Sequence, residues 1–125
     1  MTKLKVLIAD GLADDGIAIL QRVADVTSKP KITTEELIAE LPQYQALVVR
    51  SRTKVTKLVI DAGTSLKVIG RSGVGVDNID VDAATVKGIA VVNSPLAATV
   101  SVAELTMRLI IAMSREIPRG DSAMK

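Results

Sequence analysis

The sequence predicts an α/β fold in which a five-stranded parallel sheet lies between two layers of helices, a three-layer doubly wound arrangement. Two observations favour this class. Short apolar segments alternate five times with segments of helical periodicity. The apolar segments at residues 46–49 and 89–92 also lack the polar alternation of a half-solvated strand. Such strands are typical of a sheet that is covered on both faces.

The elements follow in chain order. We expect strands at residues 4–9, 25–28, 46–49, 66–69 and 89–92. We expect helices at residues 13–23, 35–41, 57–62, 81–87 and 100–117. Because crossovers between parallel strands are right-handed, these five units favour the flavodoxin-like strand order 2-1-3-4-5.

Residues at the predicted helix ends support these boundaries. Two pairs have the spacing of a capping box, Thr33 with Glu36 and Ser101 with Glu104. Gly63 and Gly88 each follow a helix at a point where a left-handed residue commonly ends it. Pro118 is expected to stop the last helix.

The composition excludes several classes of function. A net charge of +2 and a single aromatic residue, Tyr44, give no reason to expect nucleic acid as a partner. The chain has no cysteine and no histidine, so we expect no thiolate nucleophile, no imidazole base and no metal site. The apolar run at the amino terminus is too short for a membrane span or a secretory signal. We therefore expect a cytoplasmic protein without a membrane partner.

The last predicted helix is apolar on most of its surface. A single polar stripe runs along residues 100–117, formed by Ser101, Glu104, Arg108 and Arg115. The helix is also longer than a five-residue strand, at about 25 Å against about 17 Å, so it should extend past the sheet. We expect one domain at residues 1–98 and a long helix at residues 99–125. That helix packs on its own domain or on a second chain, which favours a homodimer.

The candidate site lies just after the predicted strands, because ligands of a doubly wound sheet bind beyond the carboxyl ends of its strands. The residues at this edge that carry the prediction are Arg50, Ser51, Arg71, Gly73, Val74, Gly75 and Asn93. The two glycines allow a ligand to approach bare amides, and Arg71 adds a permanent forked charge. This pattern favours an anion site, with an ordinary strand-to-helix turn as the alternative. Arg52 and Lys54 are expected on a solvated rim.

Other uses of this fold match less well. A phosphorylated receiver needs an aspartate after the third strand, where this chain has Arg50. A flavin phosphate loop after the first strand would meet the acidic residues Asp10, Asp14 and Asp15. The segment 73–75 is not a dinucleotide fingerprint either, because Asn78 stands where the third glycine belongs.

Two motifs carry a resemblance to a known family. The segments VRSRTKVT at residues 49–56 and VIGRSGVGVDNID at residues 68–80 closely resemble the D-2-hydroxyacid dehydrogenases, in particular the D-3-phosphoglycerate dehydrogenase branch. The order continues in KGI at residues 87–89, VNSP at 92–95 and SVAELT at 101–106. The resemblance covers the amino-terminal substrate-binding domain of such enzymes and the first helix that crosses into their nucleotide-binding domain.

The resemblance implies a role in serine biosynthesis and a division of labour within the enzyme. Arg50, Ser51 and Arg71 would bind the phosphate and carboxylate of a 3-phosphoglycerate-like substrate, with the amides of Val74 and Gly75 and the side chain of Asn93. The NAD site and the catalytic arginine, glutamate and histidine come later in the family's polypeptides, so no cofactor is expected in this chain. We expect weak anion binding and no dehydrogenase activity from it alone. The alternative is a structural or dimerisation module with a vestigial anion cleft.

The chain departs from the family pattern at three positions. Ala97 and Ala98 stand where a glycine and an asparagine are usual, and Arg52 stands where a small residue is usual. Since alanine favours helix, these residues could extend the last helix back toward Pro95. In the family this segment is the hinge between the substrate-binding and nucleotide-binding domains, so contacts on its cofactor side would change as well.

Overall fold

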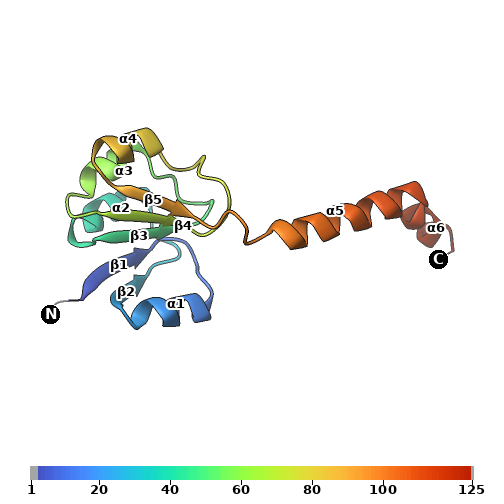
Figure 1. Ribbon diagram of the computed structural model, residues 1–125, viewed down its shortest axis with the longest axis horizontal. Coiled ribbons are helices and arrows are strands. Elements are labelled where there is room, and N and C mark those ends of the chain that lie inside the picture. Colours follow the sequence, from blue (N-terminus) through green and yellow to red (C-terminus); the bar gives the residue numbers. More distant parts are fainter. Residues whose placement is uncertain (1–2, 125) are drawn as a thin grey trace. The chain divides into compact units, whose positions relative to one another are not determined.

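The computed structural model describes residues 3–124, except for the side chains of residues 117 and 118, and divides at residue 94 into two units (Figure 1). The first unit holds one five-stranded sheet. Its strands are β1 (Leu4–Ile8), β2 (Ala24–Ser28), β3 (Ala46–Val49), β4 (Val68–Arg71) and β5 (Ala90–Asn93). All neighbours pair in parallel, in the order β2-β1-β3-β4-β5. The predicted α/β fold and its strand order are confirmed.

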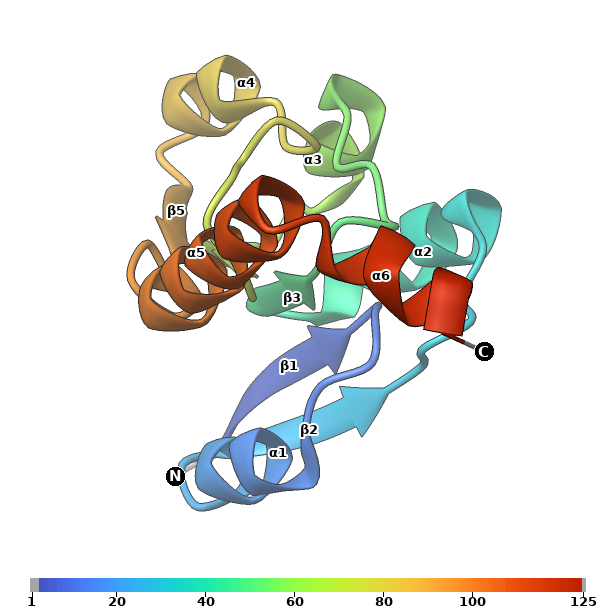
Figure 2. The ribbon, with the colours of Figure 1, turned by 90° about the vertical axis from the view of Figure 1, so that its right-hand side faces the viewer.

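The helices of the first unit are short and connect successive strands along the chain. They are α1 (Asp14–Gln21), α2 (Thr34–Glu40), the 3₁₀ helix η1 (Leu41–Gln43), α3 (Lys57–Ala62) and α4 (Val81–Val86). Helices α2, α3 and α4 lie on one side of the sheet and α1 lies on the other (Figure 2).

The core fills the space between the sheet and helices α2, α3 and α4. Strand residues Leu7, Leu47 and Ile69 are fully buried against this layer. Alternate residues of a strand point to opposite faces, so one set of positions supplies the whole inner face. The opposing helix residues include Leu37, Val59, Ile60 and Ala84, which are also buried. The core is aliphatic except for Tyr44, as the composition requires.

The second face of the sheet has a thinner helix layer. Helix α1 has no buried residue, although Ile8 beneath it is fully buried. Toward the other edge Val48 and Gly70 are half-buried, and Val92 has 53% of its surface exposed. The covering of this face is therefore incomplete over β4 and β5 within the first unit.

The predicted helix ends are partly confirmed. Thr33 and Glu36 form the capping box, with Glu36 N–H donating to Thr33 Oγ1 at 3.3 Å and Thr33 N–H donating to Glu36 Oε2 at 3.0 Å. Gly88 has a φ of +70°, as expected of a left-handed cap. The same prediction is wrong for Gly63, whose φ is −78°. A Cβ there would lie 2.9 Å from Leu66 Cβ, so the glycine is needed for space.

The second unit contains α5 (Thr99–Ser114) and α6 (Ile117–Met124). The capping box predicted for Ser101 and Glu104 is wrong, because the helix begins two residues earlier and Ser101 lies inside it. Glu104 instead forms an ion pair with Arg108 at 3.7 Å. The expected extension toward Pro95 is wrong as well, since the helix starts only at Thr99.

The predicted single helix 100–117 is interrupted. Helix α5 ends at Ser114, and Glu116 adopts a left-handed φ of +51° before α6 begins. Pro118 falls in the first turn of α6, where proline is tolerated because its missing N–H has no partner in a helix. It therefore starts a helix that the sequence analysis missed, and it does not end the preceding one. None of the helices within residues 3–124 has the length and hydropathy of a membrane span.

Candidate functional site

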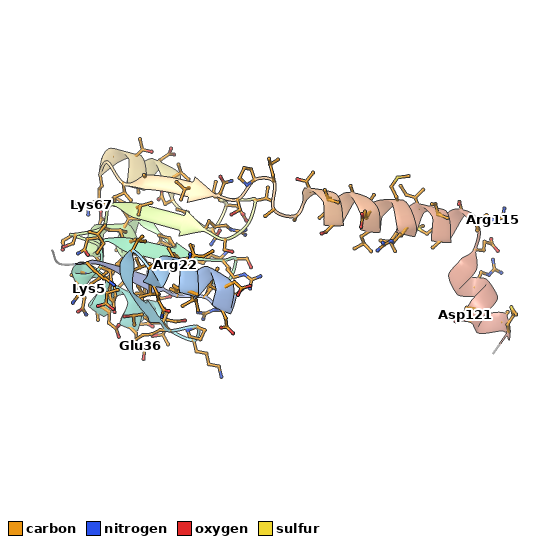
Figure 3. The ribbon with its side chains drawn as sticks, turned by 60° about the horizontal axis from the view of Figure 1, so that its bottom comes forward. Lys5, Arg22, Glu36, Lys67, Arg115 and Asp121 are labelled. Carbon is orange, nitrogen blue, oxygen red and sulfur yellow. The ribbon has the colours of Figure 1, made fainter. Side chains whose placement is uncertain are left out.

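The carboxyl ends of β3, β4 and β5 bring the predicted site residues to one edge of the sheet. Val49 pairs with Arg71, and Arg71 pairs with Asn93. Backbone bonds continue this alignment past the strands: Ser72 N–H donates to Val49 C=O and Ser94 N–H to Gly73 C=O, both at 2.8 Å. Lys5 and Lys67 lie toward the opposite, amino-terminal edge (Figure 3). The convergence of Arg50, Arg71 and Asn93 is thus a feature of the sheet register.

The Arg71 side chain is held across the glycine turn. Its Nε donates to Asn78 Oδ1 at 3.4 Å. A Cβ built on Gly73 would lie only 1.6 Å from Arg71 Nη1, so the guanidinium occupies the space that any side chain at residue 73 would need. Gly73 also has a φ of +156°. The glycine therefore allows both the backbone turn and the close approach of the charge.

Arg50 and Ser51 follow β3 with their side chains exposed. The backbone of Arg50 is fixed, because its N–H donates to Asp10 Oδ2 at 2.7 Å and its C=O accepts from Asn78 Nδ2 at 2.6 Å. Within residues 3–124 the Arg50 guanidinium has no hydrogen bond or ion-pair partner. A fixed backbone thus carries a free positive charge.

The turn after Gly73 presents free amides. Within the described part of the chain, neither Val74 N–H nor Gly75 N–H donates to a protein group. The Val74 carbonyl is bound by Asn93 Nδ2 at 2.6 Å, which ties the turn to the end of β5. The Asp77 carboxylate is close to this turn, with its Oδ1 3.0 Å from the Cβ position of Gly75. Two guanidinium groups and two free amides make this edge suited to an anion.

Two hollows flank the edge. One, of about 230 Å³, has Val48 and Val92 on its apolar side and Arg71, Ser72 and Asn93 on its polar side. The other, of about 340 Å³, lies between the start of α2 and the loop after β3. Arg50, Ser51 and the turn 73–75 line neither hollow, so the predicted residues share an edge but do not form one closed pocket.

Arg52 was predicted on a solvated rim, and its side chain is indeed 53% exposed, but it also makes specific contacts with buried groups. Its Nε donates to Asp10 Oδ1 at 2.9 Å and its Nη2 donates to the Ala9 carbonyl at 2.8 Å. Burial alone would raise the pKa of the Asp10 carboxyl. Hydrogen bonds from the Thr53 hydroxyl and from the Arg50 and Thr53 amides, with the charge of Arg52, outweigh it and lower that pKa. Asp10 therefore stays ionised although it is buried.

Asp10 and Asn78 are the polar residues that sequence reasoning missed. Asp10 was considered only as an acidic residue after the first strand that would repel a phosphate, and Asn78 only as the wrong residue for a dinucleotide fingerprint. Both are buried and both contact the Arg50 loop. Each is next to a buried apolar residue, Ala9 or Ile79, and this was a signal, because a polar residue that enters a core needs a specific partner.

Comparisons with known proteins agree with this architecture. Residues 6–119 match the family model of the D-isomer specific 2-hydroxyacid dehydrogenase catalytic domain. The D-3-phosphoglycerate dehydrogenase of Methanocaldococcus jannaschii is 52% identical over 122 residues, which are 98% of this chain and 23% of the relative. The human D-3-phosphoglycerate dehydrogenase is 48% identical over 122 residues, again 23% of its length.

A solved structure from Pyrococcus horikoshii OT3 superposes with a TM-score of 0.84 at 31% identity, over 97% of this chain and 36% of that one. An NAD⁺-bound 3-phosphoglycerate dehydrogenase from Entamoeba histolytica gives a TM-score of 0.75 at 27% identity, over 89% of this chain and 39% of that one. The chain spans about a quarter of the length of the curated relatives. The family model covers most of the chain, and the chain therefore belongs to the D-isomer specific 2-hydroxyacid dehydrogenase family.

Proposed function

We propose that this chain is the substrate-binding part of a phosphoglycerate-dehydrogenase-like oxidoreductase and that its carboxyl edge binds a small 2-hydroxy acid with an additional anionic group. The observation that carries the proposal is that two guanidinium groups, those of Arg50 and Arg71, lie at the same edge of the sheet as the unbonded amides of Val74 and Gly75. Guanidinium groups bind carboxylate and phosphate through paired hydrogen bonds. The relatives named as 3-phosphoglycerate dehydrogenases make 3-phosphoglycerate the first ligand to test.

Each proposed contact has a separate task. The two amides would bind the substrate carboxylate, since adjacent N–H groups in a turn form a concave anion site. Arg50 and Arg71 would bind the phosphate, with Ser51 and Asn93 as further hydrogen-bond donors. This edge would orient C2 of the hydroxyacid, and orientation is a large part of the rate gain of a two-substrate reaction. We place this function in the cytoplasm and in serine biosynthesis.

The described residues do not fit NAD. The turn 73–75 leads through an irregular segment to α4, which begins only at Val81, so no helix follows the turn directly to meet a pyrophosphate. The chain also has no histidine to accept the hydroxyl proton. We therefore propose that it has no dehydrogenase activity alone and that other residues supply the cofactor site. Measurable reduction of NAD with 3-phosphoglycerate by the purified chain would refute this part.

The binding proposal is tested by calorimetric titration with 3-phosphoglycerate and, separately, with inorganic phosphate. We expect weak binding, because Arg50, Ser51, Val74 and Gly75 are exposed to water in the first unit. Arg71→Gln should abolish the heat of binding. Lys67→Gln removes the same charge at the amino edge of the same strand and should leave it unchanged. Equal losses in both variants would mean that net charge alone attracts the ligand, which would refute a defined site.

The second candidate is a dimerisation module with a vestigial anion cleft. It is favoured by helix α5, on which Leu105, Ile110 and Met113 have 55%, 56% and 76% of their surfaces exposed. A soluble protein rarely leaves such a surface uncovered. Light scattering of the full chain and of a chain that ends at Ala98 separates the two cases. A dimer that becomes a monomer on truncation, without any anion binding, would favour this candidate.

A further inference from the structure

One short loop, residues 50–53, lies between two buried polar side chains. Among residues 3–124, Asp10 and Asn78 are the buried side chains that are polar or charged, with 4% and 6% of their surfaces exposed. They come from distant parts of the chain, the end of β1 and the segment before α4. Burying polar groups is costly unless they are bonded, and both side chains form most of their hydrogen bonds with this loop.

Asp10 accepts hydrogen bonds from donor groups of the loop. Its Oδ2 accepts the Arg50 N–H at 2.7 Å and the Thr53 N–H at 3.2 Å. Its Oδ1 accepts the Thr53 hydroxyl at 2.7 Å and Arg52 Nε at 2.9 Å. The four donors surround one ionised carboxylate, and hydrogen bonds to a charged acceptor are stronger than neutral ones.

Asn78 donates hydrogen bonds to carbonyl groups of the same loop. Its Nδ2 donates to the Arg50 carbonyl at 2.6 Å and to the Thr53 carbonyl at 2.8 Å. Its Oδ1 accepts from Arg71 Nε at 3.4 Å. A single amide therefore connects the backbone of the Arg50 loop with the guanidinium on the neighbouring strand.

Together the two side chains bind both backbone groups of Arg50 and both backbone groups of Thr53. Of the two residues between them, Arg52 is bound to Asp10 and to the Ala9 carbonyl, and Ser51 is left for other partners. Within the described residues, Ser51 has no hydrogen bond through its amide or hydroxyl, and the Arg50 guanidinium is also unpaired. The loop is thus fixed at Arg50, Arg52 and Thr53, while Ser51 and the Arg50 charge remain available.

We infer that Asp10 and Asn78 are positioning residues, which hold Arg50, Ser51 and Arg71 in one arrangement before the anion arrives. This inference rests on the proposed function, because the arrangement matters only if an anion binds there. A loop that is ordered in advance loses less conformational freedom on binding, so its affinity is higher for the same contacts. Neither residue needs to touch the ligand.

The test compares variants of the whole chain by two measurements. The first is the Kd for 3-phosphoglycerate from calorimetry, and the second is the hydrogen-exchange rate of the Arg50 and Thr53 amides without ligand. Asn78→Ala should raise the Kd about tenfold or more, and it should speed exchange at both amides. Thr53→Val removes one hydroxyl contact to Asp10 and should have a smaller effect of the same kind. Thr53→Ser retains that hydroxyl and should restore both values.

A matched control separates positioning from general loss of stability. Ile89→Val removes one core methyl at the amino edge, far from the loop, and should leave the Kd and the two exchange rates unchanged although the Tm falls. If folded Asn78→Ala and Thr53→Val bind as tightly as the original chain, the inference is overturned. An original chain that binds no anion refutes the proposed function instead. Exchange then still decides whether the loop is held, and unchanged rates in both variants overturn the inference in that case as well.

Discussion

Replacing Gly73 by alanine should separate the anion site from the stability of the fold. The new Cβ would lie 1.6 Å from Arg71 Nη1, and two such atoms need about 3.5 Å. The guanidinium must therefore move by about 2 Å, which breaks its 3.4 Å contact with Asn78. The end of an arginine side chain can make this movement at little cost. The clash should therefore be relieved mainly by displacement of the Arg71 charge.

The expected magnitudes differ for stability and for binding. A non-glycine residue at the φ of residue 73 costs about 1–2 kcal/mol, which lowers the Tm of a domain of this size by roughly 5–10 °C. A misplaced guanidinium loses a hydrogen bond to a charged ligand, worth about 1.5–3 kcal/mol, so the Kd for 3-phosphoglycerate should rise about 10- to 100-fold. Thermal unfolding and calorimetric titration measure the two quantities independently.

Two other glycines provide matched controls. Gly88→Ala introduces a similar backbone penalty, at a φ of +70°, but its Cβ has no atom within 4 Å. Gly70→Ala adds a methyl group in β4 at an ordinary 3.8 Å from Val92. We expect Gly88→Ala to lower the Tm without changing the Kd, and Gly70→Ala to change neither by much. The reasoning is refuted if Gly73→Ala binds the ligand as well as Gly88→Ala does.

Three further predictions concern the fold, acid stability and assembly. Because the folded pKa of Asp10 is lowered, its stabilisation is complete above the carboxyl's unfolded pKa, near pH 4, and is lost as the pH falls through the folded value. Asp10→Asn should therefore destabilise the chain at pH 7, and its urea unfolding midpoint should fall less steeply with pH below about pH 4 than that of the original chain. An equally steep fall in both chains would contradict this. Thr33→Ala should cost about 1 kcal/mol in urea unfolding by removing the capping box, whereas the neighbouring Thr34→Ala should cost less. Leu105→Asp on α5 should abolish any dimer seen by light scattering, and a dimer that persists would exclude this face as its interface.

The sheet could be predicted from the sequence because its signals are local and repeated. Apolar segments such as 46–49 define strands, and their lack of alternation defines parallel pairing. The strand order then follows from crossover handedness. The break in the last helix was missed because Glu116 is a common helix residue, and its left-handed φ could not be read from its type.

The residues of the candidate site could be predicted from the sequence better than the contacts between them. Arg50, Arg71 and Asn93 were placed at one edge by the rule that parallel strands end together, and the register bears this out. The role of Asn78 could not be predicted, because its partners Arg50 and Thr53 are 28 and 25 residues away. The contact of Arg52 could not be predicted for the same reason, since its partner Asp10 lies 42 residues away.

The most direct test of the anion site is a titration of the isotope-labelled chain with 3-phosphoglycerate, followed by amide chemical shifts in NMR spectra. Lys5 and Lys67, at the opposite edge of the sheet, serve as the internal reference (Figure 3). We expect saturable shifts at the amides of Ser51, Val74 and Gly75, with none at the two lysines. Shifts that favour the lysine edge, or no saturable shift at any amide, would contradict this expectation.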